Sequence, residues 1–171
     1  MLDSLTLLTY LLVQPHKKPP VTPKFVISSP AFNDREFIPQ KYTCWGKNIS
    51  LPLKWSGIPK GTVSLALVLV DEDAPRQQWY HWAVFNIPPS LSRLRANMQF
   101  SAPTLVANNS WGQQKYSGPC TPNGVQHYSI RLYALDTRLP NNVDHNPINI
   151  SEVMRQHIIA TAQIEGRAKS P

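Results

Sequence analysis

An acidic cluster followed by a histidine is the part of the sequence whose residue types could do chemistry. Asp71, Glu72 and Asp73 are consecutive, Ala-Pro follows them, and His81 comes shortly afterwards. A neighbouring carboxylate raises the pKa of an imidazole and favours the imidazolium form. An imidazolium backed by a carboxylate can hold an anion through a charge-assisted hydrogen bond. We therefore expect Asp71 to orient His81 in an anion pocket, although Asp71 and Asp73 could also simply cap a turn.

A second segment could complete such a pocket. Residues 116–124 read YSGPCTPNG, in which glycine allows a tight turn and the prolines restrict its shape. A turn of this kind can present backbone N–H groups to an anion. The loop is therefore expected to supply donors beside His81.

Short strands are expected to position these residues. Residues 64–71, SLALVLVD, form a continuous apolar run that predicts a strand buried on both faces and ending in the acidic cluster. Alternation over 81–87 predicts a strand with His81, Ala83, Phe85 and Ile87 on one face. Residues 126–135 predict a long strand. Near the end, Ser151 is expected to cap a short helix reaching about residue 157, followed by a strand over about 158–165.

Composition favours one all-β domain. The chain has 171 residues, 42% of them hydrophobic, and its 17 prolines disfavour a helical bundle. Short apolar runs separated by Pro, Gly and Asn clusters are typical of a β-sandwich. We expect a flexible, Pro- and Lys-containing extension over residues 1–24 and a single domain over 25–171. The net charge of +7 is scattered without a basic block, so we expect no nucleic-acid partner.

The two cysteines leave the redox state open. Cys44 and Cys120 are far apart and match no zinc-ligand spacing, so they could be buried thiols or a long-range disulfide.

No apolar run approaches the ~20 residues needed to span a bilayer. Residues 5–13 lack the basic flank and cleavage site of a leader, so we expect a loosely ordered extension or a misplaced start codon there, with a weak signal or anchor as the alternative. We expect a cytoplasmic location, with a periplasmic or secreted one left open.

Several blocks of the sequence, in this order, resemble the phosphatidylethanolamine-binding protein family in its bacterial and archaeal branch. The blocks are SSPAF, YTCWGKNISLPLKWSGIP, SLALVLVDEDAP, WYHWAVFNIP, NSWGQQKYSGPCTPNG, HYSIRLYALD and HIIATAQIEGR. The resemblance covers about residues 25–169. It implies a central antiparallel sheet packed on a smaller second sheet, short peripheral helices, and a surface pocket for phosphate-like anions.

Site residues follow from the resemblance by position. Asp71, Asp73 and Pro75 match the family's D-x-D-A-P motif, His81 matches the pocket histidine, and Trp79 matches a rim aromatic. The pocket loop corresponds to residues from Gly118 through Cys120 to Pro122.

One position departs from the family pattern. The family usually has His-x-Tyr entering the strand after the pocket loop, and alignment on Tyr128 puts Gln126 where that histidine should be. His127 would then face the opposite side, unless a bulge turned it back. We therefore expect Gln126 and Tyr128, rather than His127, in the ligand-binding set. Anion affinity should be weaker than in relatives with two histidines, because a glutamine carries no charge.

The leading hypothesis is a non-enzymatic binding protein for phosphate-like or carboxylate anions, such as a phospholipid head group. The resemblance also implies a possible protein partner, a kinase or a protease. An alternative is a hydrolase or lyase in which His81 acts as general base with Asp71, and for which Cys120 is the only candidate nucleophile near the pocket. A third is a partner-binding module that uses the N-terminal arm.

No cofactor motif is present, and a metal on Asp71, Asp73 and His81 is disfavoured because the loop offers too few oxygen ligands.

Overall fold

The computed structural model describes residues 23–75 and 78–171. Residues 1–22, which make up most of the predicted extension, lie outside this range. Among the described residues, no helix is long and apolar enough to cross a membrane.

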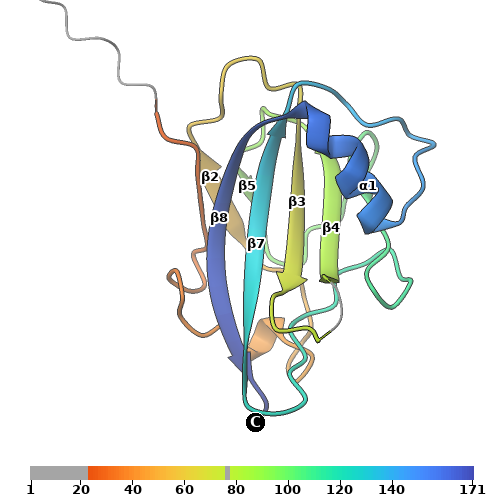
Figure 1. Ribbon diagram of the computed structural model, residues 1–171. Coiled ribbons are helices and arrows are strands. Elements are labelled where there is room, and N and C mark those ends of the chain that lie inside the picture. The colour runs from red at the N-terminus through yellow and green to blue at the C-terminus, as the bar shows by residue number, and fades with distance from the viewer. Residues whose placement is uncertain (1–22, 76–77) are drawn as a thin grey trace, which may run out of the picture.

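Two antiparallel sheets form the molecule (Figure 1), and the all-β fold class is confirmed. The central sheet has the strand order β6-β4-β3-β7-β8 and the small sheet has the order β1-β2-β5. The strands of the central sheet are β3 (Ser64–Asp71), β4 (Trp79–Ile87), β6 (Leu105–Val106), β7 (Val125–Leu135) and β8 (Ile158–Lys169). Those of the small sheet are β1 (Val26–Ser28), β2 (Leu53–Ser56) and β5 (Arg93–Leu94).

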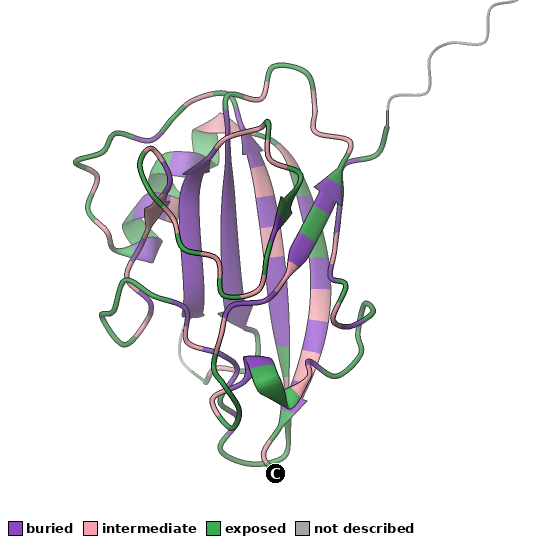
Figure 2. Cartoon of the chain, turned by 180° about the vertical axis from the view of Figure 1, so that it is seen from behind, coloured by how far each residue is buried: buried purple, intermediate pink, exposed green. Residues whose placement is uncertain are grey.

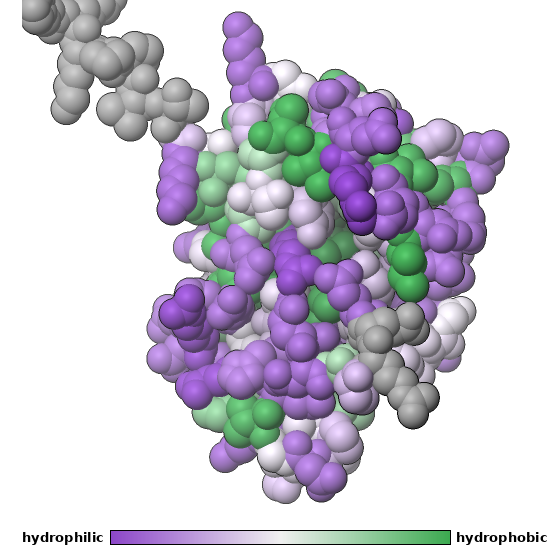
Figure 3. Space-filling model, in the orientation of Figure 1, coloured by the Kyte–Doolittle hydropathy of each residue, from purple (hydrophilic) through white to green (hydrophobic). Residues whose placement is uncertain are grey.

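Both faces of β3 are covered, as its continuous apolar run predicts. All eight residues of this strand are buried (Figure 2). Leu65, Leu67 and Leu69 belong to the core between the two sheets, whereas Ala66 and Val68 belong to a second core beneath helix α1 (Pro147–Met154). The alternation follows from the two-residue period of a strand. By contrast, the surface seen from the side of β7 and β8 is largely hydrophilic (Figure 3).

The helix begins earlier than the sequence suggests. Asn146, not Ser151, is the N-cap, and its side chain accepts a hydrogen bond from the backbone N–H of Ile148 at 2.9 Å. Pro147 takes the first helical turn, where its missing N–H costs nothing. Ser151 lies inside the helix and donates to the carbonyl of Pro147. A 3₁₀ turn, η2 (Arg155–His157), links the helix to β8; another, η1 (Gln40–Tyr42), precedes the small sheet's second strand.

The last strand is longer than expected. It runs past residue 165 to Lys169 because β7 begins at Val125, which pairs with Lys169. Each added pair satisfies backbone groups that would otherwise need water. This extension brings the C-terminus beside the pocket-forming end of the sheet (Figure 1).

Two irregularities in β4 change the predicted faces. Leu69 pairs with Trp82 but Val70 pairs with Tyr80, so His81 is an extra residue in its strand. A bulge of this kind redirects a side chain. The expectation that His81 shares a face with Ala83 and Phe85 is therefore wrong: His81 turns toward Tyr128, on the side of the inter-sheet core. A second register shift, next to which Asn86 has a φ of 57°, puts Ile87 in that core as well.

Candidate functional site

A cavity of about 250 Å³ opens where β3 ends and β4 begins, at the lower end of the sheet in Figure 1. Seven of its lining residues are among those singled out from the sequence: Asp71, Pro75, Trp79, His81, Cys120, Pro122 and Gln126. Ala74 and Trp111 complete the lining. Three distant stretches of chain therefore meet at one hollow, as the sequence analysis requires.

His81 is held by the backbone of the pocket loop. Its Nδ1 lies 2.8 Å from the carbonyl oxygen of Ser117 and 3.0 Å from that of Gly118. Carbonyl oxygens only accept hydrogen bonds, so Nδ1 carries the proton and Nε2 carries the lone pair of the neutral ring. Among the described residues, Nε2 has no hydrogen-bond partner. The ring therefore presents one uncommitted nitrogen.

Burial, rather than the aspartate, dominates the electrostatics of His81. The residue is 2% exposed, and this desolvation lowers its pKa, against the opposing effect of the two carbonyls. No hydrogen bond joins His81 to Asp71. The expectation that Asp71 orients the imidazole and raises its pKa is therefore wrong, because backbone carbonyls do the orienting. At neutral pH the imidazole ring is therefore uncharged unless a bound anion stabilises its protonated form.

Aromatic rings fix the plane of the imidazole. The His81 ring meets Trp111 edge-to-face at 5.0 Å between centroids and Tyr128 at 5.2 Å. Trp79 in turn meets Trp111 at 5.3 Å, also edge-to-face. Such contacts between rings are worth about 0.5–1.5 kcal/mol beyond buried area. His81 consequently has little freedom to rotate away from the pocket.

Tyr128 lies beneath the pocket and positions Gln126. The phenol is fully buried, and burial raises its pKa to about 12, so it remains a hydroxyl. Its O–H donates to Oε1 of Gln126 at 3.2 Å. That bond fixes the orientation of the carboxamide and leaves its NH₂ group as the donor that the pocket can use.

Asp71 is the one acid in the lining. It is 8% exposed, and burial raises the pKa of its carboxyl above the usual value. Its Oδ1 accepts a hydrogen bond from the backbone N–H of Asp73 at 2.9 Å, which closes the turn after β3. The turn-capping alternative and the pocket role thus coexist in this residue.

Asp73 and His127 lie outside the pocket. Oδ2 of Asp73 accepts from the backbone N–H of His127 at 2.7 Å and lies 2.9 Å from Nδ1 of its ring. The backbone hydrogen bond is the largest cause of a lowered pKa for Asp73. Register across β7 is continuous here, so no bulge turns His127 inward, and Gln126 lines the cavity instead.

Gly118 supports the pocket from behind. Its N–H donates to Oδ1 of Asn48 at 2.7 Å, and a Cβ atom there would lie 2.2 Å from the carbonyl oxygen of Tyr42. Only glycine fits this close approach of two backbones. Gly118 therefore acts through its carbonyl on His81 and does not line the cavity itself.

Cys120 is bonded to Cys44. The sequence left this pairing open, because nothing in the spacing of two cysteines decides it. The disulfide ties the pocket loop to the segment between β1 and β2, where the N–H of Cys44 also donates to the carbonyl of Pro119. Disulfides are more typical of oxidising compartments than of the cytoplasm, so the cytoplasmic location stays a prediction without support from this feature.

Trp111 is the residue that sequence reasoning missed. It is exposed and lies in a turn organised by Asn109, whose Oδ1 accepts from the N–H groups of Trp111 and Gln113. The only sequence signal was a tryptophan in a polar turn, which is a common and weak one. Within the described part of the chain, no group of three or more His, Cys, Asp or Glu side chains could hold a metal ion.

Comparison with known proteins agrees with this architecture. The family model described as phosphatidylethanolamine-binding protein matches residues 28–169. A UPF0098 protein of Methanothermobacter thermautotrophicus is 43% identical over 140 residues, which are 80% of this chain and 93% of the relative. A UPF0098 protein of Chlamydia muridarum is 37% identical over 82% of this chain and 95% of its own.

Two solved structures share the fold. The crystal structure of a phosphatidylethanolamine-binding protein homologue from Chlamydia trachomatis has a TM-score of 0.80 and 34% identity, and the match covers 86% of this chain and 98% of that one. YbcL of E. coli, described as a member of the mammalian family, has a TM-score of 0.79 and 26% identity over 86% and 99% of the two chains. On the combined strength of the sequence match and the shared fold, this chain belongs to the phosphatidylethanolamine-binding protein family.

Proposed function

We propose that the pocket at the end of β3 binds a small ligand bearing a phosphate or carboxylate group, such as a phospholipid head group, without transforming it. The observation that carries this proposal is the environment of His81. Its Nδ1 is fixed by two carbonyls and its Nε2 has no hydrogen-bond partner among the described residues. Family membership supports a binding role for this domain.

Binding is coupled to a proton. When an anion enters, the neutral imidazole can take up a proton at Nε2 and donate it as a charge-assisted hydrogen bond. The two carbonyls that accept from Nδ1 stabilise the resulting cation. Gln126 adds a neutral donor, since its carbonyl is already occupied by Tyr128.

The other lining residues favour a ligand that also carries a cationic group. Asp71 would repel a bare anion when ionised, but it can pair with an ammonium group next to the phosphate. Trp79 and Trp111 line the same cavity, and aromatic faces attract ammonium groups by about 0.5–2 kcal/mol. A zwitterionic phosphoethanolamine group therefore fits the lining better than inorganic phosphate.

The hydrolase or lyase alternative lacks a thiol, hydroxyl or amine nucleophile in the described lining. Cys120 is in a disulfide, and the other described lining residues carry no hydroxyl or amine. His81 could still act as a general base toward a bound water. That alternative predicts release of inorganic phosphate from a phosphomonoester, whereas the binding proposal predicts none.

Calorimetric titration tests the proposal. At about pH 6, where imidazole protonation is within reach, we expect phosphoethanolamine to bind more tightly than inorganic phosphate or acetate. His81→Ala should weaken binding at least about tenfold, the effect of losing one charge-assisted hydrogen bond.

Substitutions at two neighbouring residues, Gln126 and His127, control for the chance that His81→Ala weakens binding by disturbing the fold. Gln126→Leu should weaken binding about fivefold, the value of one hydrogen bond, whereas His127→Leu should leave it unchanged. If His81→Ala and Gln126→Leu bind as tightly as the wild type, the pocket has been assigned wrongly.

A further inference from the structure

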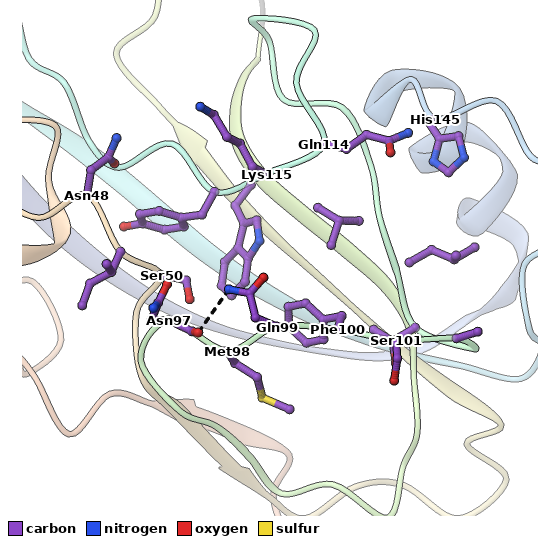
Figure 4. A pocket seen from close by; sticks show the side chains of 17 residues that line it. Asn48, Ser50, Asn97, Met98, Gln99, Phe100, Ser101, Gln114, Lys115 and His145 are labelled. Carbon is purple, nitrogen blue, oxygen red and sulfur yellow. Dashed lines mark hydrogen bonds between the residues drawn. The ribbon is translucent and has the colours of Figure 1, made fainter.

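A second and larger cavity, of about 580 Å³, lies beside the edge of the sandwich (Figure 4). It opens between loops that flank the small sheet and the edge strand β6 of the central sheet. No residue that lines it also lines the pocket at the end of β3. Its volume lies within the range of about 300–1,000 Å³ typical of small-molecule sites.

The wall of this cavity is rich in uncharged polar groups. Four carboxamides and three aliphatic hydroxyls line it: Asn48, Asn97, Gln99, Gln114, Ser50, Ser101 and Thr104. The phenol of Tyr116 also lines it but already donates to the carbonyl of Tyr42. No hydrogen bond engages the carboxamides of Asn97 and Gln114 among the described residues, and Oγ of Ser50 is buried without a partner. A buried polar atom without a partner destabilises the protein. A ligand group that forms a hydrogen bond with Oγ of Ser50 would remove that cost.

The charges of the lining narrow the ligand class. It contains no aspartate, glutamate or arginine, and Lys115 is its one permanently charged side chain. A multiply charged anion would find too few cations, and a cation would find no carboxylate. A carboxamide both donates and accepts, which matches hydroxyl groups that do the same. The wall therefore suits a neutral or singly negative molecule with several hydroxyls.

The floor adds an apolar surface of a particular shape. Trp82 meets Tyr116 at 84° and Phe100 at 45°, so it is parallel to neither ring. Phe100 is partly exposed at the cavity, whereas Trp82 is almost fully buried. Rings at these angles make no parallel slot in which a flat heterocycle could be sandwiched. They can instead contact the C–H face of a saturated ring whose rim carries hydroxyls.

We propose that this cavity is a second binding site, separate from the anion pocket, for a polyhydroxylated molecule of mono- or disaccharide size with at most one negative charge. Asn97, Gln114 and Ser50 bind its hydroxyls, and Phe100 packs against its ring. Lys115 accommodates a single carboxylate where the sugar carries one. This inference is independent of the function proposed for the pocket at the end of β3.

Saturation-transfer NMR on the full chain provides the test. The probes are methyl β-glucoside, methyl α-mannoside, maltose and glucuronate, with adenosine as a flat aromatic comparison. At least one sugar should bind at concentrations up to about 20 mM, the affinity range of a few hydrogen bonds, and should shift the amide signals of Phe100 and Gln114. If no sugar binds, or if adenosine binds and the sugars do not, the proposal is wrong.

Variants locate the binding. Gln114→Ala should weaken it about fivefold, the value of one lost hydrogen bond. Asn97→Gly should do the same without backbone strain, because φ at this residue is 57°. Gln113→Ala is the matched control, since Gln113 is an exposed neighbour that does not line the cavity. His81→Ala should also leave sugar binding unchanged. Equal affinity in Gln114→Ala, Asn97→Gly and the wild type would overturn the assignment.

Discussion

The two cavities differ in how their polar groups are held. At the end of β3, the imidazole of His81 is fixed by two backbone carbonyls, and the carboxamide of Gln126 is fixed by Tyr128. In the larger cavity, the carboxamides of Asn97 and Gln114 have no such partners among the described residues. Fixed groups lose little entropy when a ligand arrives, whereas free ones must be ordered.

The cavities also differ in charge. The first contains a buried histidine and a buried aspartate, both with shifted pKa values, and the second contains neither kind of group in comparable burial. One fold thus carries a small pocket with fixed polar groups and a wider cavity in which two carboxamides have no hydrogen-bond partner in the described part of the chain.

Removing the disulfide should have the largest effect on stability and should affect ligand binding at the two cavities differently. The Cys44→Ala/Cys120→Ala double variant should lose about 4 kcal/mol of unfolding free energy, because the crosslink closes a loop of 76 residues in the unfolded chain. Urea unfolding measures the loss. Anion binding should weaken more than sugar binding, since Cys120 itself lines the first pocket and neither cysteine lines the second cavity. Wild-type protein in reductant should behave like the variant, and a loss below about 1 kcal/mol would contradict the expectation.

Asn109 should instead affect both cavities. Its buried side chain accepts from Trp111 and Gln113 and donates to Lys115 and Ser117, so it shapes the loop that the cavities share. Asn109→Ala should cost about 1–3 kcal/mol, because buried backbone groups lose their partners. Thermal unfolding and both titrations measure the effect. Asn108→Ala is the control, and a variant that impairs only one site would show that the loop is not shared in this way.

The pH dependence should distinguish the cavities without mutation. Burial lowers the pKa of His81 and raises that of Asp71, so the free pocket has an uncharged imidazole at neutral pH. Lowering the pH protonates the imidazole and favours an anion, so affinity for sulfate should rise as the pH falls from about 8 to about 6. Calorimetry in two buffers of different ionisation enthalpy should detect proton uptake. His145 is the one histidine in the described lining of the second cavity, and neutral hydroxyls form no ion pair with it. Sugar binding should therefore change less than anion binding across the same range, and the reverse pattern would contradict the contrast.

The smallest effects should come from the paired aspartates. The pKa of Asp71 is raised, so its ionised form costs stability once the pH rises through that pKa, and Asp71→Asn should be more stable than the wild type near pH 7. The pKa of Asp73 is lowered, chiefly by the backbone hydrogen bond from His127, so its contribution is present above the unfolded pKa of 3.8 and is lost as the pH falls below it. Asp73→Asn should therefore be slightly less stable near neutral pH. Urea unfolding near pH 7 and near pH 3 checks both signs, and equal signs would contradict the assignment.

Local patterns predicted much of the fold and part of the site. The apolar run of β3, the turn after Asp71 and the placement of Gln126 on the strand face of Tyr128 all depend on neighbours in the chain, so the sequence carried enough information. The start of α1 was missed because Asn146 and Pro147 make a stronger helix start than Ser151. The direction of His81 was missed because a bulge depends on the partner strand, which periodicity in one strand does not reveal.

Motifs and periodicity are properties of the chain, so the family, the layered β architecture and most of the residues that line the pocket at the end of β3 could be predicted from the sequence alone. The contacts that each of these residues makes depend instead on the tertiary structure. Carbonyls rather than Asp71 hold His81, Cys44 rather than solvent meets Cys120, and Trp111 enters from a remote turn. The physical reason is that desolvation and hydrogen-bond partners come from segments distant in sequence, and these set both pKa and orientation.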